Sequence, residues 1–186
     1  MRHLLMLLTL CAGPVWAAPA SYSLQPEASV VGFETDFGSD KITGQMPITR
    51  ADLTLDFKNV SASRVAVTLD AAHADASFPF AAQAMKGPKV LDSKDFPQIS
   101  FVSTSVKSKG DGAEVTGKVT IRGVTKPMVM QAMIWRQKGT EAGDLSHLTI
   151  RLTGAVNRSD FGAVGWSDMV GDQVRLDILA RIVRAE

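Results

Sequence analysis

The chain has almost no cysteine, because Cys11 is the only one in 186 residues. It lies in an apolar run, residues 4–11, which follows a short basic start containing Arg2. A break at 12–14 and small residues before a cleavage position after Ala17 complete the pattern of a secretory signal peptide. We therefore expect residues 1–17 to be removed and residues 18–186 to form one exported domain. This domain has no cysteine, which excludes disulfides, thiol catalysis and cysteine-ligated metals.

An excess of either charge is also lacking. The sequence has 20 Lys and Arg against 19 Asp and Glu, with no block of like charge. This balance argues against nucleic-acid binding through a basic stripe and against membrane docking through a polybasic segment. After the leader, no apolar run approaches the length of a transmembrane helix, so we expect a chain that does not span the membrane.

Motifs of common enzyme classes are missing as well. The sequence has no P-loop, no dinucleotide-binding glycine fingerprint and no H-E-x-x-H motif, and residues 165–169 lack the second glycine of a nucleophile elbow. His73 lies between Asp70 and Asp75, but residues three apart on an extended segment point to opposite faces, so we expect no metal site. We therefore predict a protein that is not an enzyme and has no cofactor.

What the sequence does contain is a series of alternating segments. Apolar and polar side chains alternate over residues 115–122, residues 123–127 supply turn residues, and residues 128–135 form a second extended run. This pattern predicts an antiparallel hairpin, with Lys126 in its turn. In the second run Met128 and Met130 share a face, and flexible thioethers beside Gly117 indicate an adaptable, lipid-lined surface. Ordinary core packing is the alternative.

Similar alternation marks seven further segments: residues 29–36, 41–47, 51–57, 64–70, 98–106, 147–157 and 173–184. Residues 71–96 break it, and there we expect a short helix at 79–85, with Pro79 in its first turn. Eight or nine short strands without helices between them predict an all-β antiparallel sandwich or up-and-down barrel.

The expected last strand is apolar on one face and needs a partner. Pairing it with the first strand would close a barrel and remove both sheet edges. Four expected inward positions carry small residues, which favours a cavity inside such a barrel. They are Gly117, Ala132, Gly154 and Ala180.

Four segments resemble the YceI family: SVVGF at 29–33, FPQISF at 96–101, GKVTIRGVTKP at 117–127 and NRSDFG at 157–162. The resemblance runs from about residue 21 to 186. It implies an exported bacterial protein of the periplasm, an extended eight-stranded antiparallel lipocalin-like barrel with one short helical insertion, which holds polyisoprenoid or fatty-acyl chains. The chain departs from the family pattern at 33–37, which lack a histidine, and at 84–91, so the ligand identity does not carry over.

The resemblance also implies a tunnel for one long apolar tail. We predict eight residues that line or cover it, with plain core packing as the alternative for each. They are Phe33, Phe80, Met85, Phe101, Val119, Met128, Met130 and Trp166. Arg158 is a ninth candidate, as a contact for a phosphate or carboxylate head group. Its alternative is a turn held by the side chain of Asp160.

The resulting hypothesis is a periplasmic carrier of an amphiphile with an isoprenoid or fatty-acyl tail, an isoprenoid quinone among them. Its head would lie near a mouth formed by residues 71–96. A barrel that binds a protein partner and no small ligand is the second hypothesis, which a broad apolar patch outside the barrel would support. An enzyme acting on the tailed ligand is the third, and it requires titratable groups inside the barrel. The expected partner is an amphiphilic lipid, with a homodimer left open.

Overall fold

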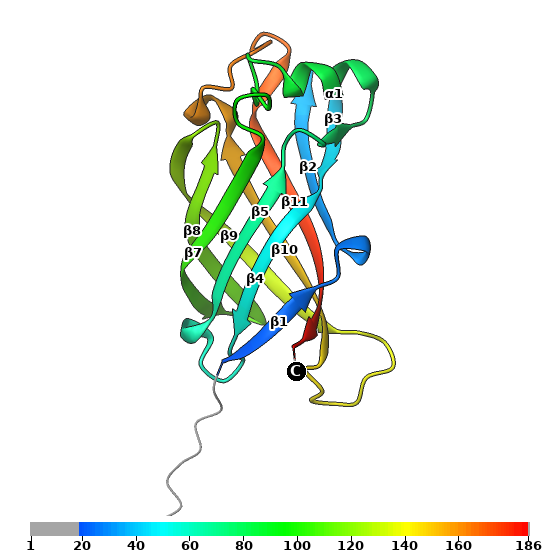
Figure 1. Ribbon diagram of the computed structural model, residues 1–186, viewed down its shortest axis with the longest axis vertical. Helices are drawn as coiled ribbons and strands as arrows, with labels where there is room; N and C mark the ends of the chain where they lie inside the picture. Colours follow the sequence, from blue (N-terminus) through cyan, green and yellow to red (C-terminus); the bar gives the residue numbers. More distant parts are fainter. Residues whose placement is uncertain (1–18, 186) are drawn as a thin grey trace, which may run out of the picture.

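The strands form one antiparallel sheet that closes on itself in the computed structural model, which describes residues 19–185 (Figure 1). The predicted leader, residues 1–17, lies outside this described part. Strand order is β1-β4-β5-β7-β8-β9-β10-β11-β2-β3-β6, and β11 also pairs with β1. The strands are β1 (Ala20–Leu24), β2 (Val30–Phe37), β3 (Asp40–Met46), β4 (Ile48–Leu55), β5 (Arg64–Asp70), β6 (Asp75–Ala76), β7 (Gln98–Lys109), β8 (Gly112–Ile121), β9 (Val124–Arg136), β10 (His147–Asn157) and β11 (Val170–Arg184).

Two of the barrel strands are interrupted at proline. The 3-10 turn η1 (Pro26–Ala28) separates β1 from β2, and Pro47 separates β3 from β4. Proline has no N–H to give to a ladder, so a strand commonly ends or bends there. Both β1 and β2 pair with β11, and they pair on their other side with β4 and β3. Counted as two continuous strands, these four segments give the closed eight-stranded antiparallel barrel that the resemblance implies.

Strand boundaries follow the sequence pattern closely. The predicted segments 64–70 and 147–157 coincide with β5 and β10, and the predicted helix is α1 (Pro79–Lys86). The predicted pairing of the first and last strands is confirmed by the ladder between β2 and β11. The pattern misses β1, because Tyr22 is the one large apolar residue in its interior and offers no alternation to detect.

The hairpin between β8 and β9 is tighter than the sequence predicts. Its turn consists of Arg122 and Gly123, with φ values of 51° and 72°, which is the geometry of a two-residue hairpin. Lys126 and Pro127 therefore lie in β9 and not in the turn. Proline is tolerated there because β10 pairs with β9 only from Met130 onward, so no ladder bond to β10 is lost.

Residues 71–97 cover one end of the barrel. They include β6, which pairs with β3, and α1, which lies at the same end in Figure 1. The loop between β10 and β11, which begins with η3 (Arg158–Phe161), lies at this end too. The two segments are joined by a hydrogen bond that the Gly165 amide donates to the Lys89 carbonyl over 2.8 Å. We call this end, formed by residues 71–97 and 158–169, the mouth.

The opposite end of the barrel, which we call the closed end, is filled by side chains. Leu148 and Ile182 are 0% exposed there and pack with Tyr22. The Tyr22 ring meets Phe57 edge to face, with centroids 6.0 Å apart, and its hydroxyl donates a hydrogen bond to the Leu145 carbonyl over 2.9 Å. Burial raises the pKa of Tyr22 above its ordinary value. The barrel is thus solid at the closed end.

Candidate functional site

A long apolar cavity fills the barrel between the closed end and the mouth. Its volume is about 330 Å³, inside the range of roughly 300–1,000 Å³ that ligand pockets usually have. Leu55 and Ile182 form its floor, because they line the cavity and also belong to the closed-end cluster. Val170 at the start of β11 lines the cavity, and from Val174 to Ile182 every second residue does so, a stretch of about 26 Å at roughly 3.3 Å per residue. The space is therefore long and narrow.

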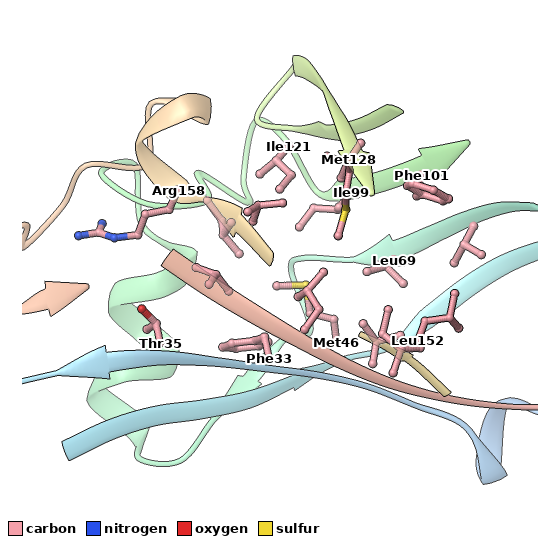
Figure 2. Close-up of a pocket in the computed structure, with 18 of the residues that line it drawn as sticks. Phe33, Thr35, Met46, Leu69, Ile99, Phe101, Ile121, Met128, Leu152 and Arg158 are labelled. Carbon is pink, nitrogen blue, oxygen red and sulfur yellow. The ribbon is translucent and has the colours of Figure 1, made fainter. Parts of the chain in front are cut away.

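Every residue that we predict for the site lines this cavity. Five come from strands, where each occupies an inward position, and Figure 2 shows Phe33, Phe101 and Met128 among them. Two come from α1, and the last two come from η3 and the loop that follows it. The nine residues are Phe33, Phe80, Met85, Phe101, Val119, Met128, Met130, Arg158 and Trp166.

The predicted set omits most of the wall that the first half of the chain contributes. Val65, Val67 and Leu69 of β5 line the cavity, as does Met46 at the end of β3. The signal for the β5 residues was present, because they alternate with outward side chains along the strand. Ala81 and other small residues of α1 also line the cavity, and nothing in a short alanine-rich helix marks which side faces a hollow.

The wall is apolar apart from three side chains: Thr35, Arg158 and the indole of Trp166. The Thr35 hydroxyl lies 3.0 Å from the carbonyls of Gly171 and Gln173, to which it donates its proton. No carboxylate or histidine is among the residues found to line the cavity in the described chain. General acid–base and nucleophilic chemistry need such groups, so the enzyme hypothesis receives no support from this wall.

Arg158 holds the mouth together from within. Its side chain is buried, and Figure 2 shows the guanidinium directed away from the other labelled residues. Nη1 donates to the carbonyls of Ala163 and Gly165, both over 2.7 Å, Nε to Gly171 over 3.0 Å, and Nη2 to Val170 over 2.9 Å. Burial lowers the pKa of this guanidinium, an effect that Asp172 partly offsets. These four bonds fix the loop between β10 and β11 and leave Arg158 little capacity for a head group.

The alternative prediction, a turn held by the side chain of Asp160, names the wrong carboxylate. Asp172, at the start of β11, makes the bonds instead: it accepts from the Ser159 amide over 2.9 Å and from the Ser159 hydroxyl over 2.8 Å. A carboxylate thirteen positions away in sequence could not be assigned from the local turn pattern, because the pairing depends on how β11 returns beside η3.

Two phenylalanines of the wall lie over glycines. Phe33 occupies the space that a Cβ on Gly44 would need, and Phe101 does the same at Gly117. The rings can lie close to the sheet because the neighbouring strand presents no side chain at these points. Large aromatic side chains thus contribute to the wall without reaching across the barrel.

The four small residues that we expected to widen the cavity divide into two pairs. Ala132 and Ala180 line it. At Gly117 and Gly154 the prediction is wrong, because neighbouring side chains take up the space. A Cβ on Gly154 would lie 3.0 Å from the Cγ of Met130, so the methionine fills what the glycine leaves free.

Outside the cavity, one sequence prediction needs correction. Asp70 and His73 do not point to opposite faces: the His73 ring Nδ1 lies 2.7 Å from an Asp70 carboxylate oxygen. They meet because residues 71–74 form a turn, in which the same carboxylate accepts the amides of Ala72 and His73. Within residues 19–185 no group of three or more His, Cys, Asp or Glu is placed to hold a metal ion. No helix of the described chain has the length and apolar character to cross a membrane.

The outside of the barrel carries one apolar stripe, on β9. Val129, Met133 and Trp135 are exposed there, but Gln131 interrupts the stripe and Arg151 lies opposite Met133 on β10. This is narrower than the broad patch that the partner-binding hypothesis requires.

Comparisons with known proteins agree with the barrel fold. A curated relative, Protein YceI of Salmonella arizonae, is 32% identical over 124 residues, which is 65% of this chain and 65% of that protein's own length. Among solved structures, BcnA of Burkholderia cenocepacia has a TM-score of 0.76 at 21% identity, covering 86% of this chain and 99% of that one. The YceI protein of Campylobacter jejuni has a TM-score of 0.60 at 21% identity, covering 76% and 84%.

At these identities the two solved structures establish the fold alone, a closed antiparallel barrel. The family is established by sequence, because the YceI-like domain matches residues 22–182, which run from within β1 to near the end of β11. The family and the hollow barrel together indicate a lipocalin-like binding protein. This chain belongs to the YceI-like domain family.

Proposed function

We propose that this chain is a periplasmic carrier of a long-tailed amphiphile, with the tail inside the barrel and the polar head at the mouth. The observation that carries the proposal is the cavity wall, which is apolar apart from three side chains. Thr35 and Arg158, two of the three polar side chains in it, are already bonded to backbone carbonyls, and the third is the indole of Trp166 at the mouth. A buried polar group on a ligand would find no partner against most of this wall and would be costly to enclose.

The energy for such binding comes from the tail. Burying one methylene contributes about 0.8 kcal/mol, so a tail of about twelve carbons contributes on the order of 10 kcal/mol before the entropy of association is subtracted. The length of the cavity matches an extended tail better than a compact ring system. Met128 and Met130 have flexible thioethers that adapt to straight or methyl-branched chains. We therefore infer a fatty-acyl or isoprenoid amphiphile, isoprenoid quinones included, as the ligand class.

A native mass spectrum of the protein purified without detergent tests the proposal directly. We expect an added mass that organic extraction removes and that fragments as a lipid. Protein that carries no lipid and takes up none when mixed with fatty acids or prenyl alcohols would contradict the proposal.

A matched pair of substitutions tests the location of the tail. Ala132 is buried in β9 and lines the cavity, whereas Ala155 is exposed on β10. We expect Ala132→Phe to weaken binding of a fluorescent polyene fatty acid at least a hundredfold. The ring displaces about four methylenes of tail, which at about 0.8 kcal/mol each is roughly 3 kcal/mol. Ala155→Phe should change the affinity less than twofold. Equal affinities for the two variants would place the tail outside the barrel.

A further inference from the structure

We propose that the mouth is a lipid-docking surface, at which the cavity exchanges its ligand directly with a bilayer of neutral headgroups. This inference rests on the proposed function and adds the partner from which the amphiphile is taken.

The first observation is an apolar surface on the rim of the mouth. Phe80 of α1 is 67% exposed, and in the facing loop Val164 is 57% and Met169 48% exposed. The two segments meet through the rings of Phe80 and Trp166, whose centroids lie 6.5 Å apart at an interplanar angle of 76°. Figure 1 shows α1 and this loop together at one end of the barrel. Large apolar side chains this exposed and this close together mark an interaction surface.

The second observation is continuity between this surface and the cavity. Phe80, Trp166 and Met169 lie on the rim and also line the cavity. A tail that leaves the barrel therefore passes apolar side chains up to the outer surface. If that surface rests in the acyl region of a membrane, the tail moves between hydrocarbon and hydrocarbon with little exposure to water.

The third observation is the backbone at Trp166, which has a φ of 52°. This left-handed conformation is rare for a residue with a bulky side chain and costs on the order of 1–3 kcal/mol where it occurs. It is held here because the Trp166 carbonyl accepts the amides of Met169 over 3.0 Å and Val170 over 2.8 Å. The strained turn places an indole on the rim, and tryptophan is the side chain most typical of the membrane interface.

The charges around the mouth indicate neutral headgroups. Residues 71–97 carry three lysines and three aspartates, and the facing loop carries two more aspartates. They are Lys86, Lys89, Lys94, Asp75, Asp92 and Asp95, and Asp160 and Asp168 in the loop. With both signs present and no basic cluster, attraction to an anionic surface is not the source of affinity. Docking through the apolar rim should therefore depend little on salt.

A bilayer fits the rim better than a protein does. Phe80, Val164 and Met169 are 67%, 57% and 48% exposed. Even at about 200 Å² for each free side chain, a size typical of an aromatic residue, they present only on the order of 350 Å² together. A specific protein interface usually buries about 800 Å² on each partner. Insertion into a fluid lipid surface needs no such complementary area.

The test compares two valines. Val164 is on the rim, and Val102, on the outside of β7, is 53% exposed; neither lines the cavity. We expect the chain beginning at residue 18 to cosediment with phosphatidylcholine vesicles and Val164→Asp to lower that partitioning at least tenfold, because a carboxylate on the rim opposes insertion. Val102→Asp should change it less than twofold. Equal partitioning of the two variants, or binding that requires anionic lipid, would overturn the proposal.

A second measurement reports on the rim itself. In the chain beginning at residue 18, Trp135→Phe leaves Trp166 as the single tryptophan. Its emission should shift to shorter wavelength when vesicles are added, because the indole passes from water to the interface. Unshifted emission under conditions where the protein cosediments would show that another surface docks. A Val164→Asp change that dissociates a dimer and leaves vesicle binding intact would assign the rim to a second copy of the chain.

Failure of this inference is separable from failure of the proposed function. Val164→Asp should bind the fluorescent fatty acid in solution with the wild-type affinity, since Val164 does not line the cavity. Its uptake of the same fatty acid from vesicles should be at least tenfold slower. If the wild-type protein binds the probe and the two aspartate variants take it up from vesicles equally fast, the carrier role stands and the docking surface is excluded. A protein that binds vesicles but no probe loses the carrier role.

Discussion

The two ends of this barrel share the same strands and pack in opposite ways. On β10, Leu148 is completely buried at the closed end. Leu152, four residues further along the strand toward the mouth, is half-buried and lines the cavity. On β11, Ile182 is completely buried and Ile178 is half-buried in the same way. Alternation along a strand therefore fixes which side chains point inward, and it does not fix whether the interior is solid.

The difference arises from what faces each inward side chain. At the closed end Tyr22, Leu148 and Ile182 converge on one another. In the hollow part Phe33 and Phe101 lie over glycines of neighbouring strands, so their rings do not meet across the axis. Wall atoms without a partner forgo dispersion contacts, and an apolar hollow holds water poorly. The protein therefore gives up packing energy along the cavity, which a tail bound there as we propose would restore.

The largest effect that tests this comparison is a pair of identical substitutions on β10. Leu148→Ala should lower the free energy of unfolding by about 3–4 kcal/mol, because it opens a cavity in a solid core. Leu152→Ala should lower it by only about 1 kcal/mol in the ligand-free protein, because that side chain already borders free space. Urea denaturation of both variants measures the difference. Equal losses would mean that the interior near Leu152 is as tightly packed as the closed end.

The next effect concerns the mouth, which Arg158 stabilises by hydrogen bonds where the closed end relies on packing. Arg158→Met should cost about 2–3 kcal/mol, because four carbonyls lose a charged donor. Arg158→Lys should cost nearly as much, since one ammonium cannot reach all four. Arg151→Met is the control: its pair with Asp177 is exposed, so a loss below about 1 kcal/mol is expected. A well-tolerated lysine at 158 would show that charge, and not the forked geometry, holds the loop.

The smallest effect is a pH dependence at the closed end. Burial raises the pKa of Tyr22, so the folded state favours the neutral phenol more than the unfolded state does. The resulting stability is complete below the unfolded pKa of about 10 and is lost as pH rises through the higher folded value. Tyr22 is the only tyrosine, so an absorbance titration of tyrosinate reports on it alone. Tyr22→Phe should lose about 1 kcal/mol at neutral pH, through the hydrogen bond to Leu145.

The control for that effect is the alkaline limb of the stability curve. Wild-type protein should lose more stability between about pH 9 and 11 than Tyr22→Phe does, because the variant has no phenol to ionise. Identical alkaline limbs would show that Tyr22 is solvated in the folded state.

The sequence predicts the strands of the barrel wall better than it predicts how the interior is filled. Residues 64–70 and 147–157 alternate without interruption, and both strands have the predicted boundaries. The five site residues on strands line the cavity because alternation, which is a local property of a strand, fixes which side chains point inward. β1 is missed because five residues with one large apolar side chain in their interior carry too little pattern.

Two of the errors concern properties that depend on a neighbouring strand, and one concerns a local turn. Whether Gly117 leaves a space depends on Phe101 of β7, and the role of Asp172 depends on the path of β11 beside η3. The Asp70–His73 pair depends on a turn where the sequence suggests an extended segment. The first two require the register between segments distant in the chain, which one sequence does not encode in its local pattern. The third requires recognising a local turn at residues 71–74.

The ladder between β1 and β11 has a consequence for the order of events in the life of the chain. Tyr22 stands opposite Arg184, so closing the barrel brings together two strands that lie far apart in the sequence. Until β11 has paired with β1 and β2, the chain is an open sheet with two unsatisfied edges, a state prone to aggregate. The hollow interior therefore exists only once this last ladder has formed, and no ligand can be enclosed before that step.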